Sequence, residues 1–87
     1  MKRLPAVAGQ FYYEDPSRLT QQVEQYVNKK AGKEDAIGIV VPHAGLIYSG
    51  AVAGAVYSSI NFPKTFIMLG PNHTGLGSPI SIVDTGE

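Results

Sequence analysis

The stretch from Ala36 to Pro63 contains no charged side chain when His43 is neutral, and this feature constrains the fold more than any other in the 87-residue sequence. A transmembrane helix would fit its length, but prolines, an asparagine and several glycines interrupt it, and each is costly or disruptive in lipid. Strands and helices buried inside an α/β protein also lack charges. We therefore expect an α/β fold and no association with a membrane.

Three strands and one of the two predicted helices are expected after residue 35. Ala36–Val41 and Thr65–Leu69 are short, apolar and rich in β-branched residues, which is typical of buried strands. Residues 51–60 between them, with Ser49 as N-cap, form a predicted helix of small residues. The crossover between these strands is long enough for parallel pairing. Ser78–Val83 alternates polar and apolar residues and is predicted as a third, antiparallel strand, so the sheet is mixed.

An amphipathic helix is predicted in the first half of the chain. Asp15 is a typical N-cap, and Pro16 suits the first helical position. The helix is expected to run to about Lys30, with Gly32 as its stop signal. Its apolar stripe consists of Leu19, Val23, Tyr26 and Val27. We expect this helix to lie on the outside of the domain.

The predicted sheet is too large for the chain to cover. Parallel strands need layers of structure on both faces, and 87 residues cannot supply them. We therefore expect the chain to be an incomplete part of a larger domain, completed by the remainder of that domain or by other copies. Alone, this part is expected to expose apolar faces and to be inactive.

Charge and cysteine content exclude several classes of protein. The formal net charge is zero, so nucleic acid is not an expected partner. The absence of cysteine excludes a disulfide framework and any thiolate site within these residues. No apolar segment follows the basic residues at the N-terminus, so no signal peptide is predicted, and the cytoplasm is the expected location.

Both histidines directly follow a predicted strand. His43 follows the first strand and His73 the second, and two strands joined by one crossover are expected to be neighbours. Ligands bind beyond the carboxyl ends of such strands, so the two imidazoles can reach a common point. The helix after His43 favours a neutral ring, which metal binding requires. Two imidazoles suit Fe(II), Zn(II) or copper with a third ligand. A hydrogen-bonded structural role for each histidine is the alternative.

Other polar residues near these turns have less specific roles. Tyr48 and Asn72 are close enough in sequence to the histidines to line the same cleft, although a packed ring and a turn amide are equally good explanations. Asp84 would lie at the far end of an antiparallel third strand, which makes it a poor third ligand. Two glycine pairs have P-loop spacing but lack the lysine, so phosphate binding of that kind is not expected.

Three segments of the chain are similar to successive signatures of the Memo family, also called AmmeMemoRadiSam system protein B. They are Pro5–Tyr12, Val41–Gly50 and Leu69–Gly75. The resemblance implies that residues 1–87 are the N-terminal third of a single Memo-like domain, with an α/β fold related to the class III extradiol dioxygenases, which use non-haem Fe(II). It also implies that His43 and His73 occupy the positions of two family histidines that approach iron or copper. The third site residue of the family is a cysteine outside this chain.

Two main functions remain open at this point. The first is a dioxygenase-like or redox protein whose complete form holds Fe(II) or Cu(I) between His43, His73 and a ligand outside this chain. The second is a non-catalytic module that binds a peptide, phosphopeptide or small molecule in the same cleft, where Phe11, Tyr12 and Tyr48 matter more than a metal. A metal-assisted hydrolase is a third, weaker alternative.

Overall fold

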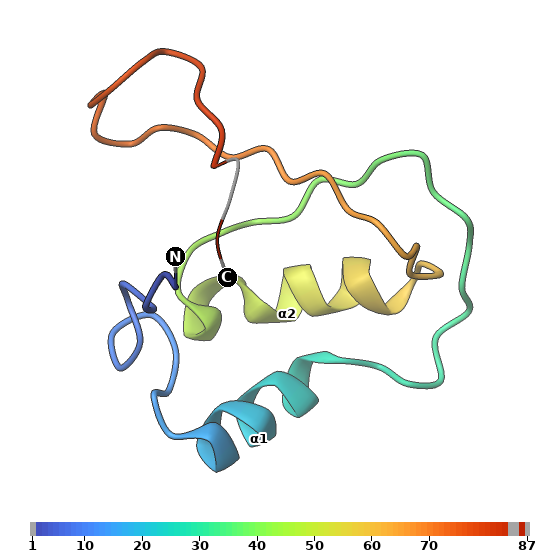
Figure 1. Cartoon of the computed structure of the whole chain (residues 1–87). Helices are drawn as coiled ribbons and strands as arrows, with labels where there is room; N and C mark the ends of the chain where they lie inside the picture. The colour runs from blue at the N-terminus through green and yellow to red at the C-terminus, as the bar shows by residue number, and fades with distance from the viewer. Residues whose placement is uncertain (1, 84–85, 87) are drawn as a thin grey trace. The chain divides into compact units, whose positions relative to one another are not determined.

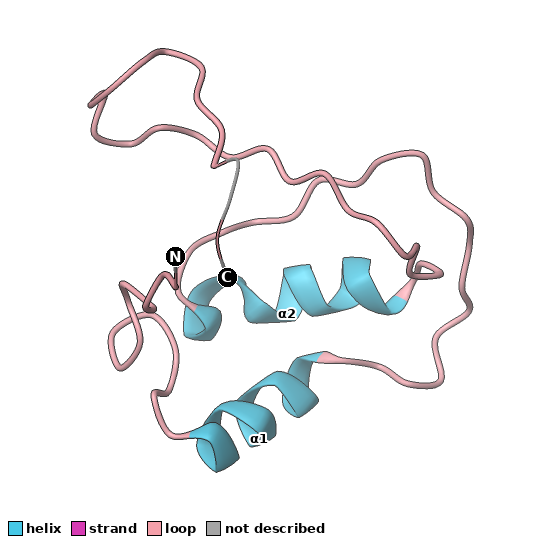
Figure 2. Cartoon of the chain, viewed as in Figure 1, coloured by secondary structure: helices cyan, strands magenta, loops and turns pink. Residues whose placement is uncertain are grey.

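The computed structural model describes residues 2–83 and 86 and divides the chain into two compact units. The helical unit is Ala6–Phe62, and the loop unit consists of Met1–Pro5 and Pro63–Glu87. Two helices, α1 (Pro16–Tyr26) and α2 (Leu46–Ser58), belong to the helical unit (Figure 1). The rest of the described chain is loop, without a strand (Figure 2). Neither of the helices in this described part has the length and apolar character that crossing a bilayer requires.

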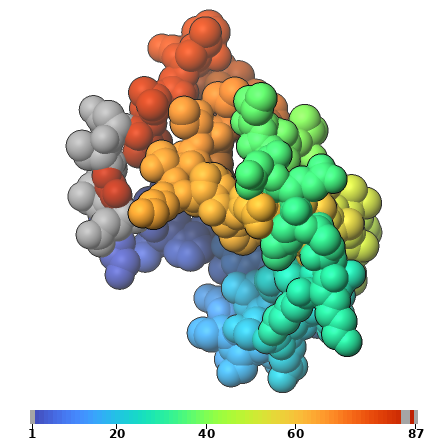
Figure 3. Space-filling model, turned by 90° about the vertical axis from the view of Figure 1, so that its right-hand side faces the viewer, coloured from blue at the N-terminus to red at the C-terminus, as the bar shows by residue number. Residues whose placement is uncertain are grey.

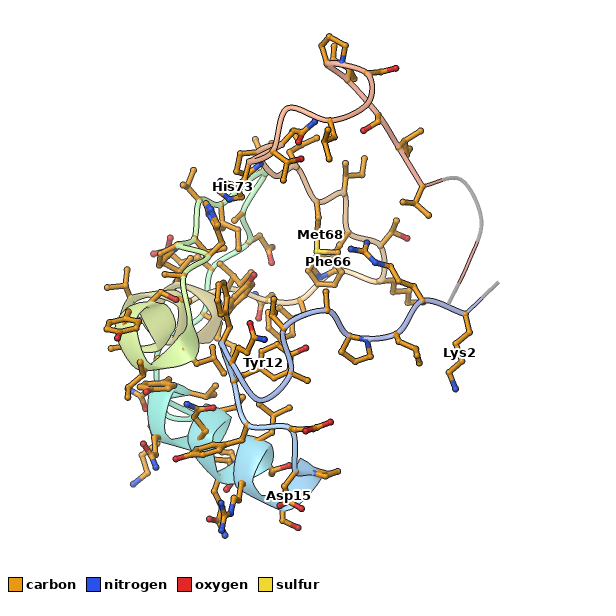
Figure 4. All side chains as sticks on the ribbon, turned by 90° about the vertical axis from the view of Figure 1, so that its left-hand side faces the viewer. Lys2, Tyr12, Asp15, Phe66, Met68 and His73 are labelled. Atoms are coloured by element: carbon orange, nitrogen blue, oxygen red, sulfur yellow. The ribbon has the colours of Figure 1, made fainter. Side chains whose placement is uncertain are left out.

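Helix α1 begins as predicted and ends earlier than predicted. The carboxylate of Asp15 accepts a hydrogen bond from the Arg18 N–H at 3.0 Å, so Asp15 is the N-cap (labelled in Figure 4). The helix was expected to reach Lys30 but stops at Tyr26, because Val27 is extended and the Asn28 N–H donates to Ser58 Oγ at 2.8 Å. A contact with the end of α2 therefore replaces the next hydrogen bond of the helix.

Helix α2 begins earlier than predicted. Ser49 was expected to be the N-cap of a helix over residues 51–60, whereas Gly45 is the N-cap and Ser49 lies inside the first turn. The Leu46 N–H, which has no partner within the helix, donates to the Phe11 carbonyl at 2.8 Å. The backbone of the N-terminal segment thus caps α2, and a serine cap is not needed.

The two helices lie side by side and run in the same direction (Figure 1). Phe11, just before α1, contacts the first residue of α2, and Asn28, just after α1, contacts the last residue of α2. Between these points Tyr26 covers Gly50 and Gly54 so closely that a Cβ at either glycine would lie less than 3.0 Å from a Tyr26 atom. The small residues predicted for this helix therefore permit close contact between the helices.

The end of the helix pair is fastened by polar contacts. Ser58 is only 2% exposed; its hydroxyl accepts the Asn28 N–H and its carbonyl accepts a hydrogen bond from Lys33 Nζ at 2.9 Å. Beside it, Glu34 and Ile60 form an isolated parallel bridge, in which the Glu34 N–H donates to the Ser59 carbonyl at 2.8 Å. This bridge joins the segment after α1 to the segment after α2.

The three predicted strands are not formed in the described residues. Residues 36–41, 65–69 and 78–83 are loop, and most of their apolar side chains are exposed, with Leu69 at 94%. Figure 3 shows the segment that follows α1, which includes residues 36–41, on the surface of the helical unit. The physical reason is that a strand needs a neighbouring ladder and covering layers, and the two helices supply neither. Asp84, considered above as a ligand, lies outside the described residues.

Replacing Gly54 by alanine is expected to destabilise the helix pair. Alanine would favour the helical backbone by about 0.5–1 kcal/mol. The added Cβ would collide with the backbone carbonyl of Tyr26, which can be relieved only if the helices separate, at a cost of about 1–3 kcal/mol. We expect a net loss of stability, measured by urea unfolding of the full-length protein. Gly32→Ala is the matched control, because a methyl group at that position would have no atom within 4 Å. Equal stability of the two variants would contradict the packing described.

Candidate functional site

His43 lies in an exposed turn directly before α2. It stands two positions ahead of the N-cap Gly45, so the prediction that a helix N-terminus follows this histidine is confirmed. Ser49, which is 6% exposed, donates its hydroxyl hydrogen bond back to the Ala44 carbonyl at 2.8 Å. The turn that carries His43 is therefore fixed by a buried side chain of the helix that follows it.

The segment Val7–Tyr12 also supports this turn. Its own turn is closed by hydrogen bonds from the Gly9 N–H to the Tyr12 carbonyl and from the Phe11 N–H to the Val7 carbonyl. The Phe11 carbonyl accepts the Leu46 N–H, and a Cβ at Gly45 would lie 3.3 Å from that carbonyl oxygen. Sequence reasoning missed this supporting role of Phe11, because a backbone carbonyl carries no signal in the sequence.

His73 lies in the exposed loop Gly70–Gly77 of the loop unit (Figure 4). The side chain of Asn72 accepts the Gly75 N–H at 3.0 Å and the Thr74 hydroxyl at 3.2 Å, and it donates to the Leu76 carbonyl at 2.7 Å. Gly75 has a φ of 69°, a left-handed conformation that glycine adopts without strain. Asn72 therefore forms the hydrogen bonds of a turn amide, one of the two roles considered for it.

The aromatic residues near the N-terminus line a shallow hollow. Phe11, Tyr12 and Ile47 are among the residues around it, and all belong to the helical unit. Tyr48, predicted to line a cleft, is 87% exposed in the first turn of α2 and does not line this hollow. The structure thus groups Phe11 with Tyr12 but not with Tyr48.

The two histidines belong to different units, so their convergence stays a prediction. His43 lies in the helical unit and His73 in the loop unit. Across residues 2–83 and 86, no three histidine, cysteine, aspartate or glutamate side chains gather where they could hold a metal ion.

Comparison with known proteins gives a consistent result along the chain. The sequence model of the Memo-like protein family matches residues 3–87. MEMO1 family proteins of Saccharolobus islandicus and Saccharolobus solfataricus are 47% and 45% identical to the chain over its whole length. One from Methanosarcina barkeri is 44% identical over 92% of the chain. The chain spans about a third of the length of these relatives, 36%, 36% and 31% respectively. No solved structure matches it.

Removing the Ser49 hydroxyl is expected to loosen the His43 turn. Ser49→Ala leaves the Ala44 carbonyl without its hydrogen bond, and we expect a loss of about 1 kcal/mol in the free energy of unfolding. Ser59→Ala is the matched control, because that hydroxyl bonds the Val56 carbonyl at an exposed position. Denaturant unfolding of the full-length protein checks both variants. A larger loss for Ser59→Ala would contradict the assignment.

Proposed function

The chain belongs to the Memo-like protein family, and we propose on that basis that the complete protein holds Fe(II) or Cu(I) between His43, His73 and a ligand outside this chain. The family match agrees with the resemblance drawn from three segments of the sequence. The observation that supports the proposal is the form of the two turns. Each histidine is exposed in a turn that neighbouring hydrogen bonds hold in shape, and the family match includes both turns.

The chemistry of the donors fits this group of metals. Imidazole nitrogen binds iron and copper well, and exposed rings are accessible to an incoming ion. Helix α2 begins three residues after His43, which places this imidazole just ahead of a helix N-terminus. When bound, the metal would supply the redox chemistry of a dioxygenase-like oxidation, while His43 and His73 would hold it in place.

We infer that the apolar segments pair as strands in the complete protein. Residues 36–41 and 65–69 each lead into a histidine turn, and parallel pairing would bring both turns to one edge of a sheet. The parallel Glu34–Ile60 bridge supports this inference, because it precedes both segments and has the predicted direction. The remainder of the same domain is the proposed cover for these segments, and other copies of the chain are the alternative.

A peptide-binding role is the second candidate. The observation that favours it is the hollow beside Phe11, Tyr12 and Ile47, which offers aromatic and aliphatic surface. A short apolar peptide and a phosphopeptide are suitable probes, titrated against the full-length protein and its Ile47→Ala variant. Binding that Ile47→Ala weakens at least several-fold, without dependence on metal, would favour this role over the first.

Replacing either histidine is expected to abolish metal binding. Loss of a direct ligand should lower affinity more than loss of a supporting residue, which typically costs about 10–100-fold. The measurement is an anaerobic titration of the full-length protein with Fe(II) and with Cu(I), for wild type, His43→Ala and His73→Ala.

A control variant and a clear negative outcome make the titration decisive. Gly32→Ala, far from both turns in the sequence and without steric contact, should bind as wild type does. Unchanged affinity in both histidine variants would refute the metal proposal.

A further inference from the structure

We propose that Asn72 is a positioning residue for His73, because its side chain closes the turn that follows that histidine. The inference rests on the proposed metal site, because it gives Asn72 the role of holding His73, one of the proposed metal ligands, in place. Asn72 itself is not placed in contact with the metal. Its role follows from three hydrogen bonds within the loop unit.

The hydrogen bonds of Asn72 use both ends of its amide. The oxygen accepts from the Gly75 N–H at 3.0 Å and from the Thr74 hydroxyl at 3.2 Å. The nitrogen donates to the Leu76 carbonyl at 2.7 Å. His73 lies between Asn72 and these three partners in the sequence, so the backbone that carries it is enclosed in a loop closed by one side chain.

The loop needs such a closure because its composition is flexible. Gly70, Gly75 and Gly77 flank His73, and a Cβ at any of them would meet no atom within 4 Å, so side-chain packing does not hold these positions. Glycine loses more backbone freedom on ordering than any other residue. Without Asn72, the backbone beside His73 would lose three hydrogen bonds, and each binding event would have to order the loop again.

Thr74 completes the arrangement. Its hydroxyl donates to the Asn72 oxygen and accepts the Leu76 N–H at 3.3 Å. The bond from the Leu76 N–H supports the same turn, but both of its residues follow His73 in the sequence. Asn72 connects to both Gly75 and Leu76 through its amide, and it is therefore the residue to test.

The test compares Asn72→Ala, Asn72→Ser and the control Asn61→Ala in the full-length protein. Serine keeps one neutral acceptor for the Gly75 N–H, as hydroxyls do in turns, whereas alanine keeps none. Asn61 is an exposed asparagine of the helical unit whose amide bonds Asp35. The first readout is NMR of the histidine rings without metal, with the His73 signals assigned from the His73→Ala variant. The second is anaerobic titration with Fe(II) and with Cu(I).

In wild type we expect one set of His73 ring signals and side-chain couplings of a single rotamer. Asn72→Ala should average these couplings and weaken metal binding by about 10–100-fold, the usual effect of losing a residue that orients a ligand. Asn72→Ser should restore part of both properties, and Asn61→Ala should change neither. If Asn72→Ala only lowered the global stability, the melting temperature would fall. The His73 couplings would then not recover selectively in Asn72→Ser.

The outcomes separate this inference from the proposed function. Unchanged His73 couplings in Asn72→Ala overturn the positioning role, whether or not metal binds. Wild-type metal affinity in Asn72→Ala overturns it too, while loss of binding in His73→Ala would leave the proposed function standing. If wild type binds neither metal, the proposed function fails, and altered couplings in Asn72→Ala with recovery in Asn72→Ser would still support Asn72 as the residue that holds His73.

Discussion

The contact of Tyr26 with Gly50 and Gly54 is the interaction on which the helical unit depends. Helices of 11 and 13 residues are marginal in water, so α1 and α2 must stabilise each other through packing. The missing side chains of the two glycines let the backbone of α1 approach α2 closely. Once α2 is placed in this way, its first turn fixes the backbone just after His43. The backbone beside His43, a candidate metal ligand, therefore depends on the contact of Tyr26 with Gly50 and Gly54, which lies more than one helical turn away.

The sequence predicted local features of this unit well and boundaries poorly. Asp15 could be identified as an N-cap because its carboxylate bonds an N–H only three residues away. The start of α2 depends on the carbonyl of Phe11, and the end of α1 depends on the hydroxyl of Ser58. Both partners are distant in sequence, and neither belongs to a pattern of periodicity or capping. Boundaries set by such contacts cannot be inferred from the neighbouring residues.

The strands and the candidate site also separate features that depend on neighbouring residues from features that depend on distant partners. The apolar runs at 36–41 and 65–69 indicate a need for burial, but a strand exists only where another strand pairs with it, and the described chain forms no ladder beside either run. The histidine turns could be located from proline and glycine, and a turn role for Asn72 was anticipated. The convergence of His43 and His73 depends on the sheet itself, so the sequence supports it only as a prediction.

The common direction of α1 and α2 has a consequence for how this part of the protein folds. Two antiparallel helices can be joined by a short turn, but here the chain must return along the full length of α1 before α2 can begin. Closing this longer loop costs entropy before any packing energy is gained. The return segment contains His43 and its turn, so it must become ordered in the same step in which the helices meet. Local opening of this region, in hydrogen-exchange terms, should therefore release the helix pair and the His43 turn as one cooperative unit.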